Sequence, residues 1–231
     1  MYINLSFQDQ LSSFMMSKKI KFFKSSAIIL TGFLSSFIWA NYLLISVKAE
    51  VIVGSGEGNG SFGLLSDFDG QYFSGQQQIG HEFIINETVE VDQIDWHGQY
   101  FPDGQPSKDK FSLRIFKMVE GVPEIKPKID VQLREVRQTK TNIERFSHPV
   151  FNYVGSVIPF QLEPGRYLLS IVNNTQGHTD DWLWMTTEPK TQLQDADLKI
   201  FFRDRDDLTW KSGLTGKMSF TIFGKPTSNS N

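Results

Sequence analysis

Apolar and polar residues alternate with a period of two along most of the chain after residue 79, as in β-strands that bury one face. Between Ile94 and Tyr100, for example, Trp96 falls on the apolar side and His97 on the polar side. The alternating segments are 83–85, 94–100, 111–115, 158–162, 167–171 and 218–222. After residue 50 no apolar stripe of helical period extends over three turns. The pattern predicts an all-β fold, a single-domain antiparallel β-sandwich that is jelly-roll-like.

Turn residues and composition set the expected boundaries of this sandwich. Glu163-Pro164-Gly165 stands between two alternating segments and predicts a hairpin. Residues 50–78 are rich in Gly, Ser and Gln, so we expect an irregular lead-in there. The aromatic side chains expected to attach this lead-in to the body are Phe62, Phe68, Tyr72 and Phe73. The sandwich is expected to span 79–224, and the polar residues 225–231 to form a disordered tail.

The N-terminal part of the chain has the pattern of an export signal. Lysines precede an uncharged apolar run from Ala27 to Val47, and Val47-Lys48-Ala49 places small residues where signal peptidase reads them. We therefore expect residues 1–49 to be a signal peptide, with Met15 or Met16 as an alternative start of translation. The run is also long enough to cross a bilayer, so a retained membrane anchor is the alternative to cleavage. The protein is expected to be secreted, periplasmic or held at the cell surface.

Charge and cysteine content narrow the classes of function. The chain contains no cysteine, which excludes disulfides, thiolate nucleophiles and cysteine-ligated zinc. Its formal net charge is -3, and removal of residues 1–49 would leave 18 basic and 25 acidic residues. An acidic protein is a poor partner for nucleic acid, whose phosphates need a basic face. Export without disulfides is more typical of bacteria than of eukaryotes.

Sequence motifs for catalysis and cofactor binding are incomplete. Residues 58–63 match G-x-G-x-x-G, but no helical pattern follows to hold a phosphate. His81-Glu82 lacks the second histidine of a zinc protease motif, and no serine lies in G-x-S-x-G. We therefore predict no catalytic residue and no cofactor. Asp67-Phe68-Asp69-Gly70 resembles part of a calcium loop, so structural calcium at Asp67 and Asp69 is an alternative to solvated loop acids.

The segment from Asp180 to Met185 is apolar on both faces of a predicted strand. Trp182 and Trp184 share one face, and Leu183 and Met185 share the other. One interpretation is that both faces are covered by other parts of the fold. The other interpretation is an exposed indole platform that stacks on sugar rings. The candidate ligand-binding residues of that platform are Trp182, Trp184, Asp180, Asp181 and Asp103.

Four segments carry a resemblance to a known group of proteins. They are Ile94-Asp-Trp96-His-Gly98-Gln-Tyr100-Phe101, Phe111-Ser-Leu-Arg-Ile-Phe116, Leu162-Glu-Pro-Gly165-Arg-Tyr167-Leu-Leu-Ser170-Ile-Val-Asn173-Asn174 and Asp181-Trp182-Leu-Trp184. The chain resembles, over about 79–223, the uncharacterised exported bacterial β-sandwich proteins that often carry a PEP-CTERM sorting tail. The resemblance implies export, a jelly-roll-like sandwich and a role in the extracellular matrix or envelope. It carries no catalytic residue, and the Pro-Glu-Pro sorting signal does not occur in this sequence.

Taken together, these patterns predict an exported binding or structural module of the bacterial envelope or extracellular matrix. Its expected partners are extracellular polysaccharide or envelope proteins, with no nucleic acid, and with a membrane only if residues 1–49 are retained. A hydrolase acting on polysaccharide is an alternative, and it requires two carboxylates that converge in a cleft. A purely structural subunit of a surface assembly is the third alternative.

Overall fold

Two eight-stranded sheets form the protein, and each pairing between its strands is antiparallel. The computed structural model describes residues 49–73, 75–104, 109–175, 178–187, 198–214 and 216–227. The predicted signal peptide therefore lies, except for Ala49, outside the described residues. Within the described ranges no helix is long and apolar enough to cross a membrane.

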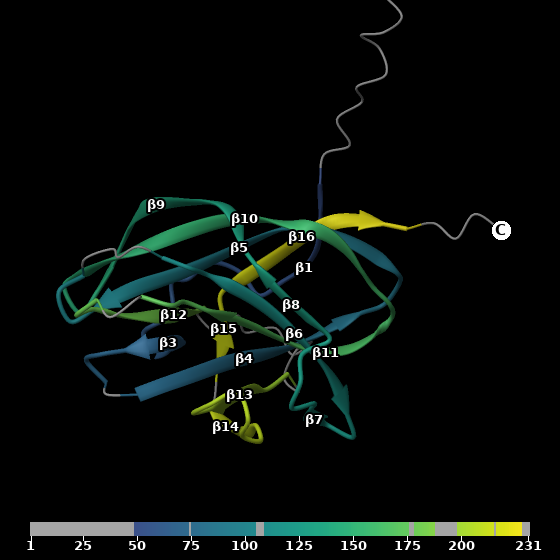
Figure 1. Ribbon diagram of the computed structural model, residues 1–231. Helices are drawn as coiled ribbons and strands as arrows, with labels where there is room; N and C mark the ends of the chain where they lie inside the picture. Colours follow the sequence, from purple (N-terminus) through teal and green to yellow (C-terminus); the bar gives the residue numbers. More distant parts are fainter. Residues whose placement is uncertain are drawn as a thin grey trace, which may run out of the picture. The chain divides into compact units, whose positions relative to one another are not determined.

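The first sheet is built around the long strand β5. Its strands are β1 (Glu50–Gly54), β2 (Gly63–Leu65), β5 (Val89–Phe101), β9 (Arg134–Arg145), β10 (His148–Leu162), β12 (Asp181–Thr187), β15 (Lys217–Met218) and β16 (Phe220–Pro226). β10 pairs with β5, whereas β16 and β12 pair with successive parts of β5. Figure 1 shows β9, β10, β5 and β16 together in one layer.

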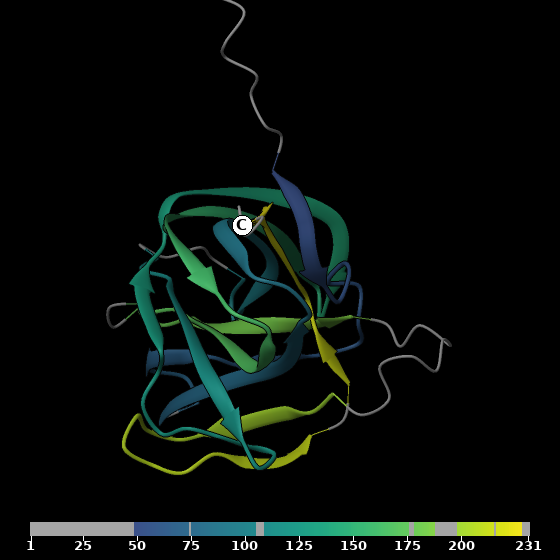
Figure 2. The same ribbon diagram turned by 90° about the vertical axis from the view of Figure 1, so that its right-hand side faces the viewer.

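The second sheet lies against the first and is built around β4 and β11. Its strands are β3 (Asp67–Gly70), β4 (Gly75–Ile85), β6 (Ser112–Val119), β7 (Val122–Pro123), β8 (Ile129–Gln132), β11 (Gly165–Val172), β13 (Ile200–Arg203) and β14 (Lys211–Leu214). Figure 2 shows the two layers from the end of the sandwich. All described residues belong to one compact unit, and the predicted all-β sandwich is confirmed.

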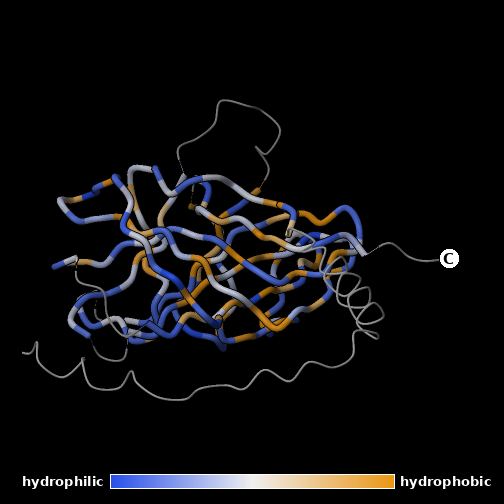
Figure 3. The backbone as a smooth tube through the Cα atoms, turned by 90° about the horizontal axis from the view of Figure 1, so that it is seen from above, coloured by the Kyte–Doolittle hydropathy of each residue, from blue (hydrophilic) through white to orange (hydrophobic). Residues whose placement is uncertain are grey.

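Alternation along the strands supplies the core between the sheets. On β5, Ile94, Trp96 and Tyr100 are fully buried, and Trp96 stacks on Tyr153 of β10 with ring centroids 5.4 Å apart. Figure 3 shows apolar and polar stretches alternating along the strands. A smaller cluster covers the outer face of the second sheet, and it consists of Phe116, Leu168, Phe201 and Trp210. The pleat explains this second cluster, because neighbours of core residues on β6 and β11 point away from the core.

Two boundaries predicted from the sequence differ from the structure. The segment 50–78 is not an irregular lead-in, since it contains β1, β2, β3 and the start of β4. β1 is a continuous apolar run, and β2 and β3 are only three and four residues long, so none of them shows a clear alternation of apolar and polar side chains. At the other end, β16 continues to Pro226, two residues past the predicted limit at 224.

The turn at Glu163-Pro164 is not a hairpin, because β10 and β11 lie in different sheets. The chain crosses from one sheet to the other there, so Leu162 and Tyr167 both point into the core. The hydroxyl of Tyr167 donates a 2.9 Å hydrogen bond to the carbonyl of Glu163 and holds this corner. Alternation on both sides of a turn does not reveal whether the two strands pair or face each other.

Candidate functional site

Both tryptophans of the predicted platform are fully buried. Trp182 packs edge-on against Phe111, with ring centroids 5.0 Å apart. The indole N–H of Trp184 donates a 2.8 Å hydrogen bond to the carbonyl of Ser219. These two rings therefore belong to the core between the sheets and do not form an exposed platform.

The opposite face of β12 is covered by β2 and its neighbours. Leu183 is 6% exposed and Met185 is fully buried. A Cβ atom at Gly63 would lie 2.9 Å from the Cβ of Leu183 and 3.0 Å from the sulfur of Met185, so only glycine allows β2 to approach this closely. Both faces of the apolar strand are thus covered, but Leu183 still forms part of the floor of a groove.

The predicted ligand-binding residue Asp181 is buried and contacts the turn between β3 and β4. Its carboxylate accepts hydrogen bonds from the backbone N–H groups of Gln71 at 2.6 Å, Tyr72 at 3.1 Å and Phe73 at 2.8 Å. Hydrogen bonds from several amides to one carboxylate are strong and directional. Asp181 therefore fixes the turn that carries Tyr72 and Phe73.

Asp67, one of the two calcium candidates, joins β3 to β12. Its carboxylate accepts backbone N–H groups from Asp69 and Trp182, both at 3.0 Å, and from Thr175 at 3.4 Å. Burial raises the pKa of Asp67, while these hydrogen bonds act in the opposite direction. Both carboxylate oxygens of Asp67 thus accept hydrogen bonds from backbone N–H groups. The binding of structural calcium by Asp67 and Asp69 stays a prediction. In the described part of the chain no group of three or more potential metal-ligating side chains occurs.

The remaining predicted residues hold a second loop at the same end of the sandwich. Asp180 is buried, and its carboxylate accepts the backbone N–H of the exposed residue Asp103 at 3.3 Å. Asp103 follows closely after Phe101, the last residue of β5. Asp180 and Asp181 thus position, through backbone contacts, two segments that carry aromatic residues.

These segments border an apolar groove of about 580 Å³, which we call the aromatic groove. Its lining residues are Phe62, Gly63, Leu64, Leu65, Tyr72, Phe73, Gln77, Phe101, Phe146 and Leu183. Three of the rings are well exposed: Tyr72 at 51%, Phe73 at 47% and Phe146 at 60%. Such an exposed group of large apolar side chains is uncommon on a soluble protein unless it contacts a partner.

Four rings of the aromatic groove support one another around Phe101. Phe73 stacks on Phe101 with centroids 5.8 Å apart, and Tyr72 meets Phe101 edge-on at 5.2 Å. Phe146, from the turn between β9 and β10, approaches the other side of Phe101 at 6.4 Å. Aromatic pairs at these distances contribute about 0.5–1.5 kcal/mol each beyond area burial. The row is therefore held in place before any ligand binds.

Polar side chains lie beside the rings. Gln77 lines the groove, and the amide of Gln71 reaches the carboxylate of Asp69 at 3.2 Å. His148 contacts the edge of Phe101 at 6.0 Å. The aromatic groove therefore has hydrogen-bond donors and acceptors next to its exposed aromatic rings.

Sequence reasoning assigned Tyr72 and Phe73 to anchoring the lead-in and did not select Phe101 or Phe146 as site residues. A signal for the first pair does exist in the sequence. Both stand between Gly70 and Gly75 in a Gln-rich stretch without alternation, which is unlike the setting of a core aromatic residue. Phe146 follows Arg145 at the end of β9 and has a positive φ of 51°, so its ring projects from a tight turn.

A polar cluster on the outer face of the first sheet contains the residue types of a catalytic triad. Ser219 lies 2.8 Å from Nδ1 of His97, and the Asn152 amide contacts both His97 and Asp95. The Ser219 hydroxyl donates its hydrogen to the carbonyl of Gly56 at 3.0 Å, so Nδ1 of His97 must be the donor to Ser219. A serine nucleophile requires an unprotonated base at that position. The cluster is therefore arranged for structure and not for nucleophilic attack.

The acids of this face lie apart from the aromatic groove. Burial raises the pKa of Asp95 to about 6, and the charge of Glu57 acts in the same direction. Asp95 accepts a 2.7 Å hydrogen bond from Asn152, which partly opposes this rise. None of the described residues lining the aromatic groove is an acid. The pair of converging carboxylates that a hydrolase needs is thus not present among those lining residues.

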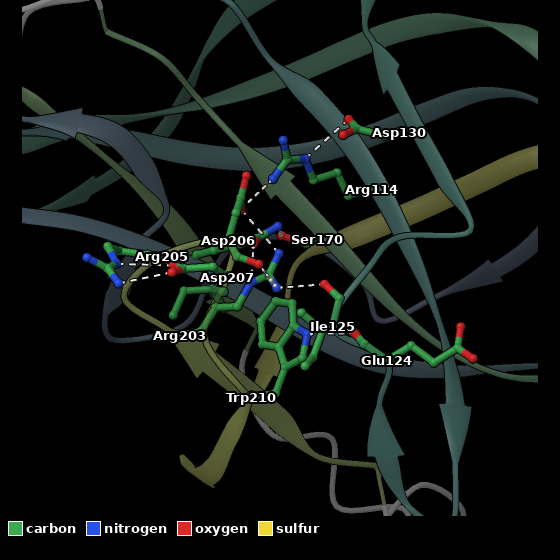
Figure 4. Close-up of polar contacts among 12 residues, drawn as sticks. Arg114, Glu124, Ile125, Asp130, Ser170, Arg203, Arg205, Asp206, Asp207 and Trp210 are labelled. Atoms are coloured by element: carbon green, nitrogen blue, oxygen red, sulfur yellow. Dashed lines mark hydrogen bonds and ion pairs between the residues drawn. The ribbon is translucent and has the colours of Figure 1, made fainter.

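The buried Arg203 organises the outer face of the second sheet (Figure 4). Its guanidinium lies between the rings of Phe116 and Trp210, at 5.0 and 4.5 Å from their centroids. It donates hydrogen bonds to the side chain of Gln78 at 2.6 Å, to the carbonyl of Ile125 and to two oxygens of Asp206. Arg203 is only 1% exposed. It therefore holds the β13–β14 connection on the sheet and is inaccessible to a ligand.

Comparison with known proteins identified no family model, no curated protein and no solved structure that matches this chain. The function is therefore argued from the aromatic groove, from its supporting carboxylates and from the polar groups beside it.

Proposed function

We propose that this protein is an exported glycan-binding module and that the aromatic groove is its binding site. The observation that carries the proposal is the row of exposed rings formed by Tyr72, Phe73 and Phe146 around Phe101. Sugar rings present flat C–H faces that pack on aromatic rings, and their hydroxyls bond to nearby polar groups. Export rests on the signal pattern expected in residues 1–49.

The hydrogen bonds that fix the turn carrying the exposed rings favour a binding role over a purely structural role. Asp181 uses both carboxylate oxygens to hold consecutive amides of the turn that carries Tyr72 and Phe73. A buried carboxylate is costly unless its hydrogen bonds are satisfied, so this anchor ties the turn tightly to β12. A site whose parts are already ordered loses less conformational entropy when a ligand binds. Gln71 and Gln77 add hydrogen-bonding capacity next to the rings.

The experiment compares Tyr72→Ala and Phe73→Ala with the unmodified protein on an array of soluble bacterial and plant polysaccharides, followed by calorimetric titration of the best ligand. Each substitution is expected to weaken binding by about two- to tenfold, the equivalent of one aromatic contact. Stability should fall by about 1–3 kcal/mol in each variant, because each substitution removes two ring pairs, so the titrations are run well below the unfolding temperature. Ile158→Ala is the matched control, since Ile158 is 57% exposed on β10 and lies outside the groove.

Two results would contradict the proposal. One is glycan binding that is unchanged in both groove variants. The other is a protein that binds no glycan but self-associates or captures an envelope protein through Tyr72 and Phe73, which would favour the structural-subunit alternative.

A further inference from the structure

A second and larger cleft, of about 760 Å³, lies at the opposite end of β4 from the aromatic groove. Gln77, near the start of β4, lines the groove, whereas Glu82, near its end, lines the cleft. Figure 1 shows β3 at one end of the sandwich and β7, which follows the cleft residue Gly121, at the other. We call this second site the basic cleft, because its lining residues include Lys117, Lys128, Arg166 and Lys199.

The buried residue Tyr167 lines the basic cleft, and two of these cations are its neighbours. The ammonium group of Lys128 lies 5.6 Å from the centroid of the Tyr167 ring. Lys117 is the direct cross-strand partner of Tyr167 on the neighbouring strand β6. A cation placed over a ring face is stabilised by the ring quadrupole, so Lys128 is held over the cleft.

The acid at the base of the cleft does not cancel these charges, because it has its own partners. Glu82 is 2% exposed and accepts hydrogen bonds from the guanidinium of Arg166 at 2.7 and 2.8 Å. Its other oxygen accepts the backbone N–H of Lys199 at 3.3 Å. Arg166 thus neutralises Glu82, and the lysines remain as the excess positive charge.

Two further acids that line the cleft, Glu120 and Glu163, are exposed. Glu163 accepts a 2.8 Å hydrogen bond from the hydroxyl of Thr88, and Glu120 lies in the turn between β6 and β7. Within the described ranges, neither Lys117 nor Lys199 forms an ion pair. The cleft therefore offers exposed ammonium groups and exposed carboxylate acceptors, and its lining residues carry one more positive than negative charge.

We propose that the basic cleft binds the carboxylate of an acidic sugar of the uronate class. Ammonium groups attract the carboxylate, while the carboxylates of Glu120 and Glu163 can accept hydrogen bonds from sugar hydroxyls. The acidic balance of the chain repels long polyanions such as nucleic acid. The volume suits a ligand of one or two sugar rings.

The test titrates the protein with an oligomer of galacturonic acid and with the matching neutral galactose oligomer. Lys117→Gln/Lys199→Gln removes two cleft charges, and Arg137→Gln/Lys140→Gln removes two exposed charges from β9 as the matched control. The cleft variant should bind the acidic oligomer about tenfold more weakly, whereas the control should change by less than about twofold. Added salt should weaken binding to the unmodified protein.

Four outcomes would overturn the proposal: equal losses in both variants, no preference for the acidic over the neutral oligomer, displacement by inorganic sulfate at equal concentration, or tighter binding of a single-stranded oligonucleotide. Tyr72→Ala is included because it should leave uronate binding unchanged. Failure at the cleft is thereby distinguished from failure at the aromatic groove.

Discussion

The buried carboxylate of Asp181 on β12 accepts a 2.8 Å hydrogen bond from the backbone N–H of Phe73, whose ring is 47% exposed in the turn between β3 and β4. An acid without access to solvent thus determines where an exposed aromatic residue stands. The same carboxylate also holds Gln71 and Tyr72. The stability of this turn and the glycan binding that we propose for the aromatic groove therefore both depend on one side chain.

We expect Asp181→Asn to lower the free energy of unfolding by about 1–3 kcal/mol, because an amide NH₂ replaces an oxygen that accepts backbone N–H groups. Hydrogen exchange of the amides of residues 71–73 should become faster, and glycan binding should fall as it does in Tyr72→Ala. Asp103→Asn is the control, since this exposed side chain should contribute no more than about 0.5 kcal/mol. Unaltered exchange in Asp181→Asn would show that the turn is held by other contacts.

Trp182→Ala and Trp184→Ala should each lower the free energy of unfolding by about 3–5 kcal/mol, the usual cost of deleting a large core aromatic residue. Trp184→Ala also leaves the carbonyl of Ser219 without its indole donor. Phe146→Ala, which truncates a 60% exposed ring, should lower the free energy of unfolding by only about 0.5–1.5 kcal/mol, the contribution of its ring pair with Phe101. Urea denaturation of the three variants measures the contrast, and similar values for all three would contradict the burial of the indoles.

Arg203→Lys should destabilise the protein by about 3–5 kcal/mol although it conserves the charge. A lysine cannot lie flat between Phe116 and Trp210 while bonding to both Gln78 and Asp206. Thermal or urea unfolding provides the measurement. In the control Arg205→Lys, the pair with Asp207 is exposed on both sides, so the loss should be near zero. Full stability in Arg203→Lys would mean that charge alone matters at this position.

The raised pKa of Asp95 leads us to expect that the stability of the protein depends on pH. Burial raises the pKa of Asp95 to about 6, so the folded protein keeps a proton that the unfolded chain releases near pH 3.8. Stability attributable to Asp95 therefore decreases as the pH rises from about 4 to about 6. Burial lowers the pKa of His97, which gives an opposite slope because the folded protein resists protonation as the pH falls.

Comparison with Asp95→Asn isolates the first effect, since His97 contributes equally to both proteins. Asparagine keeps an oxygen that accepts the Asn152 amide and carries no charge to desolvate. The variant should be more stable than the unmodified protein by roughly 1 kcal/mol at pH 7, a value reduced by partial exposure of the site, and equal to it near pH 3. Urea denaturation across this range checks the prediction, and a constant difference at every pH would contradict it.

The two-layered architecture follows from the alternation of apolar and polar residues along the chain. Residues such as Ile94 and Trp96 alternate with polar neighbours, and a strand with one apolar face must be covered by a second layer. Alternation did not predict β1, β2 or β3, because β1 is a continuous apolar run and β2 and β3 are too short to show a period of two. It also could not show that the turn at Glu163-Pro164 joins two sheets, since strands that pair and strands that face each other share the same pattern.

Which aromatic residues are exposed, and which groups the buried acids bind, depends on contacts between distant parts of the chain. The rings of Tyr72, Phe101 and Phe146 come from three separate parts of the chain, and they meet because β12 pairs with β5 while Asp181 binds the turn after β3. Burial of Trp182 likewise depends on the sheet that covers it. A residue type specifies what a side chain can bond to, but the partner that it finds depends on chain segments distant in sequence.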